Sequence, residues 1–321
     1  MIEQFRWGIL GTGGITVRVA PGFLNARHKI AIVGSRDPER GRAHAAKIGA
    51  ERSGSYDDVL AADDIDAVYI SLPNSLHLPW TIRAAEAGKH VLCEKPMATT
   101  PADCRAMTEA CEKHGVRLAE AFMYRHHPRW AVVRSIIDSG EIGPLLTVKA
   151  HFGYRQDRIG DVRLSPELQG GSIQDVGCYA VNVVRWFLGE PDRVLGAAID
   201  RRGIGVDTHA SAILRYANGT IGIVECGFDG PMGQSVEFLG EKGRIEVPLA
   251  FLPRGDEPVN VTTLEGQRTE IVPLANQFGR QFAAFEAFVR HGEPMSTTPQ
   301  DAEATQVVIA AWRAGGETPA A

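Results

Sequence analysis

Cysteine is scarce in this chain, and its pattern excludes two kinds of cysteine-rich protein. The five cysteines, at positions 93, 104, 111, 178 and 226, are odd in number and lack the paired spacing of a metal site. We therefore predict neither a disulfide framework nor a cysteine-ligated metal. The histidines, including the adjacent pair His126-His127, have no third ligand at a useful spacing, so no metal site is predicted.

Long apolar runs and basic clusters are also missing. No stretch approaches the roughly 18 apolar residues that a membrane span requires. The first six residues, Met-Ile-Glu-Gln-Phe-Arg, lack the basic and then apolar pattern of a secretory signal, so we expect a cytoplasmic protein. Acidic residues outnumber basic ones by 39 to 34, which gives no electrostatic reason to bind nucleic acid or an acidic membrane.

The first part of the chain has the pattern of an α/β domain. The whole chain has 321 residues, of which 44% are hydrophobic and 23% charged, and this is enough for two domains with ordinary cores. Residues 1–122 alternate short apolar runs with helix-like stretches, which predicts βαβ units around a parallel sheet. The predicted strands are residues 5–10, 30–34, 67–72, 90–93 and 116–121. Asp37 is the predicted cap of one helix, with Pro38 at its first position.

Residues 123–321 have a different pattern, in which several short strands follow one another closely, and this predicts an α+β domain with an open, mostly antiparallel sheet. The predicted strands are residues 145–154, 194–200, 208–216, 220–228, 236–239, 244–247, 259–264 and 269–272. Asn218-Gly219 predicts a tight hairpin between two of them. Helices are predicted at 128–139, 175–189, 276–291 and 300–314, and residues 315–321 are expected to form a loose tail.

A glycine-rich loop follows the first predicted strand. Its sequence, Gly11-Thr-Gly-Gly-Ile-Thr16, matches the first five positions of the G-x-G-x-x-G/A fingerprint. Glycines there allow backbone amides and a helix N-terminus to meet a pyrophosphate, which predicts dinucleotide binding by a Rossmann domain. Thr16 departs from the usual Gly or Ala, and we expect it to loosen the contact between strand and helix.

The end of the second predicted strand bears on the choice of cofactor. NAD-binding proteins place an acidic residue there for the ribose hydroxyls, but this chain has Gly34-Ser-Arg-Asp37. Ser35 and Arg36 could donate to a 2′-phosphate, with Arg40 one turn later, and the helix-cap role accounts for Asp37. NADP is therefore the predicted cofactor and NAD the alternative, while a solvated surface charge is the other interpretation of Arg36.

Polar side chains fall on one face of the predicted helix 175–189. Asp175, Tyr179 and Asn182 line up at helical spacing among mostly apolar neighbours. Such a helix should be buried nearly all round, so these groups need polar partners or an open cavity. They form either one wall of a pocket or ordinary core groups, with Asp175 as a helix cap.

Lys95 follows the fourth predicted strand, at the sheet edge where open α/β sheets bind ligands. Alone it is either a functional group or a surface charge. Paired with Tyr179 it would make an acid–base system, because a tyrosine with an ordinary pKa of about 10 needs a nearby ammonium to act as a base. Asp175 would then orient a substrate hydroxyl or tune the lysine.

Several motifs, in order along the chain, resemble the Gfo/Idh/MocA (glucose–fructose oxidoreductase / inositol dehydrogenase) family. Besides the glycine loop, they are Ser71-Leu-Pro-Asn-Ser-Leu-His77, Cys93-Glu-Lys-Pro96, Glu120-Ala-Phe-Met-Tyr-Arg125 and Gly170-Gly-Ser-Ile-Gln-Asp-Val-Gly-Cys-Tyr179. The resemblance implies a Rossmann domain over residues 1–122 and a substrate-binding domain over 123–321. It also implies homo-dimers or homo-tetramers built through the exposed face of the second sheet.

The resemblance also implies roles for single residues. Many members place a catalytic histidine where this chain has Tyr179, and the pattern here is similar to the subgroup of dihydrodiol and NADP-dependent D-xylose dehydrogenases. Lys95, Tyr179 and Asp175 are then the catalytic candidates. Substrate would also contact Arg163 and Asn182. The candidate cofactor residues are Gly11, Thr12, Gly13, Gly14, Ile15, Ser35, Arg36, Arg40, Leu72, Pro73, Asn74, His77, Glu94 and Lys95.

The sequence therefore predicts an NADP(H)-dependent oxidoreductase that transfers a hydride between nicotinamide and an aldose or related cyclic polyol. One alternative is a trans-dihydrodiol or dicarbonyl oxidoreductase, and another is an enzyme whose tightly held cofactor recycles between two sugars. From a different class comes a non-catalytic NAD(P)-binding sensor.

Overall fold

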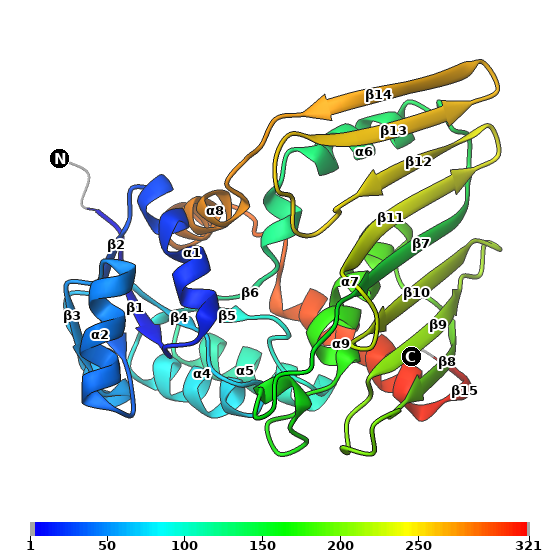
Figure 1. Cartoon of the computed structure of the whole chain (residues 1–321). Coiled ribbons are helices and arrows are strands. Elements are labelled where there is room, and N and C mark those ends of the chain that lie inside the picture. Colours follow the sequence, from blue (N-terminus) through cyan, green and yellow to red (C-terminus); the bar gives the residue numbers. More distant parts are fainter. Residues whose placement is uncertain (1–3, 320–321) are drawn as a thin grey trace. The chain divides into compact units, whose positions relative to one another are not determined.

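The computed structural model describes residues 4–319, which form two compact units (Figure 1). The first contains residues 4–126 together with Asn276–Glu303, and the second contains His127–Ala275 together with residues 304–319. Among residues 4–319, every helix is either too short or too polar to span a lipid bilayer.

The first unit is built on a parallel sheet. Within residues 4–126 its six strands lie in the order β3-β2-β1-β4-β5-β6, so the strand order reverses between β1 and β4. Their bounds are β1 Arg6–Leu10, β2 Lys29–Gly34, β3 Arg52–Gly54, β4 Ala67–Ile70, β5 His90–Glu94 and β6 Leu118–Ala121. This confirms the predicted Rossmann domain, and β3 is a short edge strand that the sequence pattern missed.

Helices cover both faces of this sheet. Their bounds are α1 Gly14–Asn25, α2 Pro38–Ile48, α3 Tyr56–Leu60, α4 His77–Glu86, α5 Pro101–Lys113 and α8 Gln277–His291, with 3₁₀ turns η1 Asn74–Leu76 and η2 Met123–His126. Alternate strand residues belong to two separate cores, one against α3, α4 and α5 and the other against α1, α2 and α8. Helix α8 joins this unit because the Phe282 ring stacks on Phe23 of α1, with centroids 3.8 Å apart.

The second unit carries a larger, mixed sheet. In its described part nine strands lie in the order β14-β13-β12-β11-β7-β10-β9-β8-β15, and all neighbours are antiparallel except β7 and β10 (Figure 1). The bounds are β7 Leu145–Gly153, β8 Arg193–Ile199, β9 His209–Arg215, β10 Ile221–Gly227, β11 Gly233–Gly240, β12 Gly243–Pro248, β13 Glu257–Thr263, β14 Gly266–Val272 and β15 Gly316–Pro319. This confirms the predicted open, mostly antiparallel sheet.

One face of this sheet is covered and the other is open. Helix α7 (Cys178–Leu188) packs on β7 and β10, and α6 (Arg129–Asp138) packs on β13. The open face exposes apolar side chains: Leu195 is 47%, Ile199 52% and Ile213 40% exposed. Leu195 and Ile213 are paired across β8 and β9, so these side chains are neighbours. The remaining elements are η3 Val162–Leu164, the π-helix η4 Ile173–Gly177 and α9 Pro299–Ala314.

Two expectations from the sequence are wrong in detail. Residues 315–321 were expected to be a loose tail, but Gly316–Pro319 forms β15 and pairs with β8, which otherwise would be the sheet edge. Residues 320–321 lie outside the described part. The helix predicted from residue 175 begins earlier, at Ile173, as the π-helix η4.

Candidate active site

The loop after β1 turns sharply at Gly11, where the backbone leaves no room for a side chain. Gly11 has a φ of +114°, and a Cβ there would lie 3.0 Å from Ser71 Oγ and 3.1 Å from Ser71 O. Gly13 is the N-cap of α1, and a Cβ on it would make only an ordinary contact, 3.8 Å from Ser71 O. A Cβ on Gly14 would meet nothing within 4 Å. The first amides of α1 therefore lie beside open space at the carboxyl edge of the sheet, as a pyrophosphate site requires.

Thr16 occupies the last position of this loop with its side chain fully buried. Its hydroxyl donates a hydrogen bond to Gly13 O over 2.6 Å. His44 Nε2 lies 2.6 Å from the same hydroxyl, and burial together with two neighbouring cations lowers the pKa of His44. A neutral His44 can donate from Nε2, so Thr16 links the loop to α2.

The turn after β2 exposes two basic side chains and uses its acidic one as a helix cap. The Asp37 carboxylate accepts from two backbone amides of the first helical turn, at 2.9 and 3.0 Å, which confirms the predicted cap. The buried Ser35 hydroxyl accepts from Asp37 N at 3.2 Å. Arg36 and Arg40 are exposed, and Arg40 Nη2 donates to Thr12 O at 3.3 Å. The turn thus presents guanidinium groups, with its carboxylate already engaged.

Two further loops reach the same sheet edge, after β4 and β5. Leu72 is buried after β4, and Pro73 and Asn74 are half-buried at the start of η1. Lys95 is half-buried directly after β5. All the predicted cofactor residues therefore lie at, or just after, the carboxyl ends of parallel strands, where this class of sheet binds ligands.

Glu94 and His77, two of these residues, bond to the protein itself. The Glu94 carboxylate accepts a hydrogen bond from the Tyr69 hydroxyl inside the sheet. His77 is 1% exposed, with Nδ1 2.9 Å from Pro96 O and Nε2 2.8 Å from Leu72 O. These contacts hold the two loops, while direct contact of either residue with a cofactor stays a prediction.

The predicted polar helix lies in the second unit. Residues 178–185 of α7 are all buried, which confirms a helix buried nearly all round. The Tyr179 ring is 5% exposed and packs against Phe152 and Phe251, with centroids 5.3 and 5.2 Å away. Asn182 is fully buried, and its amide donates to Thr305 Oγ1 of α9 over 3.4 Å. The structure therefore accounts for Asn182 by helix packing, and its contact with substrate stays a prediction.

Asp175 is the centre of a polar cluster in the same unit. Its Oδ2 accepts from the Tyr154 hydroxyl at 2.6 Å and lies 3.1 Å from Arg163 Nε. The Asp175 carboxylate raises the pKa of Arg163 further, so this guanidinium is always charged. The structure thus brings together Asp175 and Arg163, two of the candidate substrate residues, and their contact with substrate stays a prediction. It adds Tyr154, which sequence reasoning noted only as the end of a predicted strand.

The segment that carries Asp175 is anchored at its start by Asp207. The Asp207 carboxylate accepts from Ser172 Oγ at 2.8 Å and from Ile173 N at 2.7 Å. Gly171 has a φ of +109°, and a Cβ there would lie only 2.5 Å from Asp207 Oδ1. These contacts hold the start of η4. Asp207 could not be found from local sequence patterns, because it lies on a loop 35 residues after Ser172.

Comparison with known proteins identifies the family. The family model described as "Oxidoreductase family, NAD-binding Rossmann fold" matches residues 5–122, and the "GFO/IDH/MocA C-terminal domain" model matches residues 130–246. The chain belongs to the Gfo/Idh/MocA family. It is an NAD(P)-dependent oxidoreductase.

Relatives of this Gfo/Idh/MocA protein are similar over almost its whole length. A D-xylose 1-dehydrogenase (NADP(+)) of Haloferax volcanii is 39% identical, with 98% of each chain covered. A dTDP-3,4-didehydro-2,6-dideoxy-alpha-D-glucose 3-reductase of Saccharopolyspora spinosa is 34% identical, over 91% of this chain and 90% of the relative. Among solved structures, a 3-ketoreductase from Actinomadura kijaniata in complex with NADP and TDP-benzene has a TM-score of 0.92, 28% identity and 98% coverage of each chain.

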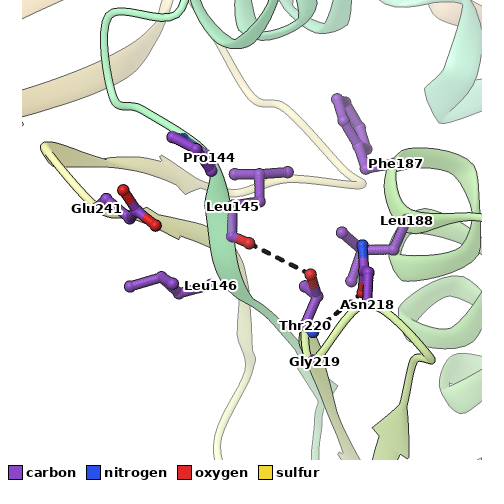
Figure 2. Close-up of a pocket in the computed structure, with 9 residues that line it drawn as sticks. All are labelled: Pro144, Leu145, Leu146, Phe187, Leu188, Asn218, Gly219, Thr220 and Glu241. Atoms are coloured by element: carbon purple, nitrogen blue, oxygen red, sulfur yellow. Dashed lines mark hydrogen bonds between the residues drawn. The ribbon is translucent and has the colours of Figure 1, made fainter.

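The second unit of this Gfo/Idh/MocA chain also contains a hollow whose lining includes none of the candidate site residues, and Figure 2 shows the residues that line it. Its volume is about 440 Å³, and it is lined by Pro144, Leu145, Leu146, Phe187, Leu188, Asn218, Gly219, Thr220 and Glu241. Phe187 and Leu188 come eight and nine residues after Tyr179, which is about 12 to 14 Å along a helix. Glu241 is its one titratable lining residue, so the hollow offers no acid–base pair. Within residues 4–319, no group of His, Cys, Asp or Glu side chains could hold a metal ion.

Proposed function

We propose that the protein is an NADP(H)-dependent oxidoreductase that transfers a hydride between nicotinamide and an aldose or related cyclic polyol. The observation that carries this proposal is the 39% identity, over 98% of both chains, to an NADP-dependent D-xylose 1-dehydrogenase. The chain has the side chains that such a reaction needs: a lysine at the Rossmann sheet edge and a tyrosine one turn after a carboxylate.

The residues of the first unit fit an NADP molecule. The crowded Gly11 and the open space beside Gly13 and Gly14 suit a pyrophosphate at the start of α1. Exposed Arg36 and Arg40 suit the extra phosphate that distinguishes NADP from NAD. When bound, the nicotinamide would supply or accept the hydride.

The chain's own residues would manage the proton and the substrate. Tyr179 would accept the hydroxyl proton as the alcohol is oxidised and return it in the reverse reaction. Lys95 would bind the same oxygen and favour the tyrosinate form of Tyr179. Asp175, held by Tyr154 and Arg163, would orient a second hydroxyl of the sugar.

The direct test follows the absorbance of reduced nicotinamide, with NADP or NAD and a panel of aldoses, polyols and dihydrodiols. Lys95→Met and Tyr179→Phe should each lower kcat by at least about a hundredfold, with NADP affinity much less affected. Lys113→Met, at an exposed helix end, is the matched control for the lysine. Tyr216→Phe is the control for the tyrosine, because among the described residues its buried hydroxyl has no hydrogen-bond partner.

The outcomes separate the candidates. Near-normal turnover in both Lys95→Met and Tyr179→Phe would refute the assignment. Turnover with dihydrodiols alone would favour the trans-dihydrodiol alternative. NADP binding without turnover on any substrate would favour a sensor, and NADP that survives gel filtration would favour the recycling mechanism.

A second candidate substrate is a nucleotide-linked keto sugar. It is favoured by the relatives named as dTDP-sugar 3-reductases and by the similar structure that holds TDP-benzene. The chemistry would be the same reaction run as a reduction. Competitive inhibition of aldose turnover by dTDP would support this substrate, whereas no effect of dTDP at millimolar concentration would favour a free sugar.

We also propose that copies of the chain pair through the open sheet face, as a homo-dimer or homo-tetramer. The exposed Leu195, Ile199 and Ile213 would lose their contact with water in such an interface. Sedimentation should show an oligomer for the wild type and a monomer for Ile213→Asp. Leu264→Asp, on a hairpin at 93% exposure, should leave the oligomer intact. A wild-type monomer at micromolar concentration would contradict the proposal.

A further inference from the structure

Buried side chains contact three backbone atoms of the turn that carries Lys95, all in Pro96 and Met97. Met97 N donates to Glu120 Oε1 over 2.8 Å, and Cys93 Sγ donates to Met97 O over 3.8 Å. His77 Nδ1 lies 2.9 Å from Pro96 O. Two of these contacts come from polar side chains, Glu120 of β6 and His77 of α4.

Glu120 is itself fixed in place. It is 1% exposed, near the end of β6, and it lies opposite Cys93 in the pairing of β5 with β6. Its backbone N–H donates to Thr297 O at 3.1 Å, and the Thr297 hydroxyl donates back to Glu120 O at 2.7 Å. A buried carboxyl group is expensive to desolvate, and its hydrogen bond from Met97 N offsets part of that cost while it ties the turn to β6.

His77 holds the same turn from the other side. Its two ring nitrogens lie close to carbonyl oxygens of two different loops, Pro96 after β5 and Leu72 after β4. A neutral ring can donate to only one of these carbonyls, and a protonated ring can donate to both. In either state the ring fills the space between the loops, because it is 1% exposed.

We propose that Glu120 and His77 are positioning residues, which set where the Lys95 ammonium lies at the sheet edge. This inference rests on the proposed function, in which Lys95 contacts substrate. Neither residue need touch substrate or cofactor for the effect. A displacement of about 1 Å in a catalytic group can reduce turnover by about a hundredfold, which gives a reason to use buried polar groups on this turn.

Paired substitutions test each hydrogen bond while keeping side-chain size. Glu120→Gln retains an oxygen that can accept from Met97 N, and Glu120→Met removes it. His77→Asn places an amide where Nδ1 meets Pro96, whereas His77→Gln places its amide where Nε2 meets Leu72. Glu120→Gln should keep kcat within about threefold of wild type, and Glu120→Met should lower it at least about tenfold. His77→Gln should lower kcat more than His77→Asn does, because only the asparagine can replace the contact with Pro96.

Two controls separate positioning from general damage. NADP affinity should change less than about threefold in Glu120→Met, because the pyrophosphate loop is elsewhere. In a Lys95→Met background, Glu120→Met should cause no further loss of kcat, because the lysine it positions is gone. A full additional loss in that background would overturn the inference, since the damage would then not act through Lys95.

A readout without substrate comes from the few lysines of this chain, at positions 29, 47, 89, 95, 113, 149 and 242. Reductive ¹³C-methylation gives each lysine an NMR signal, and Lys95→Arg assigns the one of interest. Glu120→Met should move the Lys95 signal alone, and Glu120→Gln should leave it in place. An unmoved Lys95 signal would overturn the inference.

The NMR spectrum also distinguishes failure of the proposed function from failure of the inference about Glu120 and His77. If Lys95→Met has normal turnover, the proposed function fails, and the NMR signal still decides whether Glu120 positions the lysine. If Glu120→Met does not fold, His77→Gln against His77→Asn makes the same comparison by both kinetics and NMR.

Discussion

Gly13→Ala should separate cofactor binding from folding. The structure gives no internal reason for glycine at this position: its backbone is extended, with φ −71° and ψ 163°, and a Cβ would lie 3.8 Å from the nearest atom. An alanine at a compatible position stabilises a protein by about 0.4 to 1 kcal/mol, by restricting the unfolded chain. Alanine is also a poorer N-cap than glycine, which costs up to about 1 kcal/mol. The free energy of unfolding without cofactor should therefore stay within about 1 kcal/mol of wild type.

Gly13→Ala should instead weaken the binding of the dinucleotide. A methyl group at Gly13 would project beside the first amides of α1, where a pyrophosphate needs close approach. Loss of one hydrogen bond to a charged group costs about 1.5 to 3 kcal/mol. The Kd for NADP should therefore rise by about ten- to a hundredfold, because each 1.4 kcal/mol corresponds to a factor of ten.

Gly11→Ala is the contrasting variant. At a φ of +114°, and with Ser71 atoms 3.0 and 3.1 Å from its Cβ, the alanine is strained in the protein without cofactor. Its unfolding free energy should fall by at least about 2 kcal/mol. Urea unfolding measures stability, and quenching of protein fluorescence measures NADP binding. A wild-type Kd for Gly13→Ala, or equal destabilisation of both variants, would refute the reasoning.

Three further predictions follow from the described side chains. Arg36→Ala and Arg40→Ala should each reduce NADP affinity by about tenfold and leave NAD affinity unchanged, and titrations with both cofactors measure this. An equal reduction in the affinities for NADP and NAD would contradict a 2′-phosphate site. Tyr154→Phe, which removes the hydroxyl donor to Asp175, should lower kcat about tenfold and change the pH–rate profile, while the melting temperature falls by only a few degrees. An unchanged pH–rate profile would count against a catalytic role of this cluster. Burial, aided by an adjacent arginine, lowers the pKa of His126 to about 4, so the native state excludes a proton that the unfolded chain binds below about pH 6.5. Between pH 7 and pH 4.5 the unfolding free energy of the wild type should thus fall by about 2 kcal/mol more than that of His126→Phe. An equal fall in the two proteins would show that another group is responsible.

The parts of the fold that the sequence could predict depend on neighbouring residues. The crowded Gly11 turn and the Asp37 cap are both local, because a glycine-specific φ and a capping carboxylate act within a few residues. The alternation of strands and helices likewise predicted the parallel sheet. Short elements such as β3 and α3 were missed because three to five residues carry no readable periodicity.

Contacts between distant segments could not be predicted in this way. The sequence made Asp175 a candidate site residue, but it did not indicate the neighbours of Asp175. Tyr154 follows the end of β7, and Asp207, which holds the start of η4, lies on a loop between β8 and β9. Glu120 lay in a motif that supported the family resemblance, yet its bond to Met97 depends on β5 and β6 being neighbours. Helix α8 joins the first unit through Phe282, which sequence order alone does not indicate. The functional division near residue 122 stays a prediction.

Two residues that the family resemblance assigns to the cofactor site make hydrogen bonds within the protein itself. Glu94 accepts from Tyr69, and the ring nitrogens of His77 lie close to two carbonyl oxygens. Substituting these residues should therefore reduce stability even without cofactor. The exposed Arg36 and the uncrowded Gly13 belong to the opposite class, where substitution should affect binding alone. The candidate cofactor residues therefore include two different physical roles, and only stability and affinity measured on the same variant can separate them.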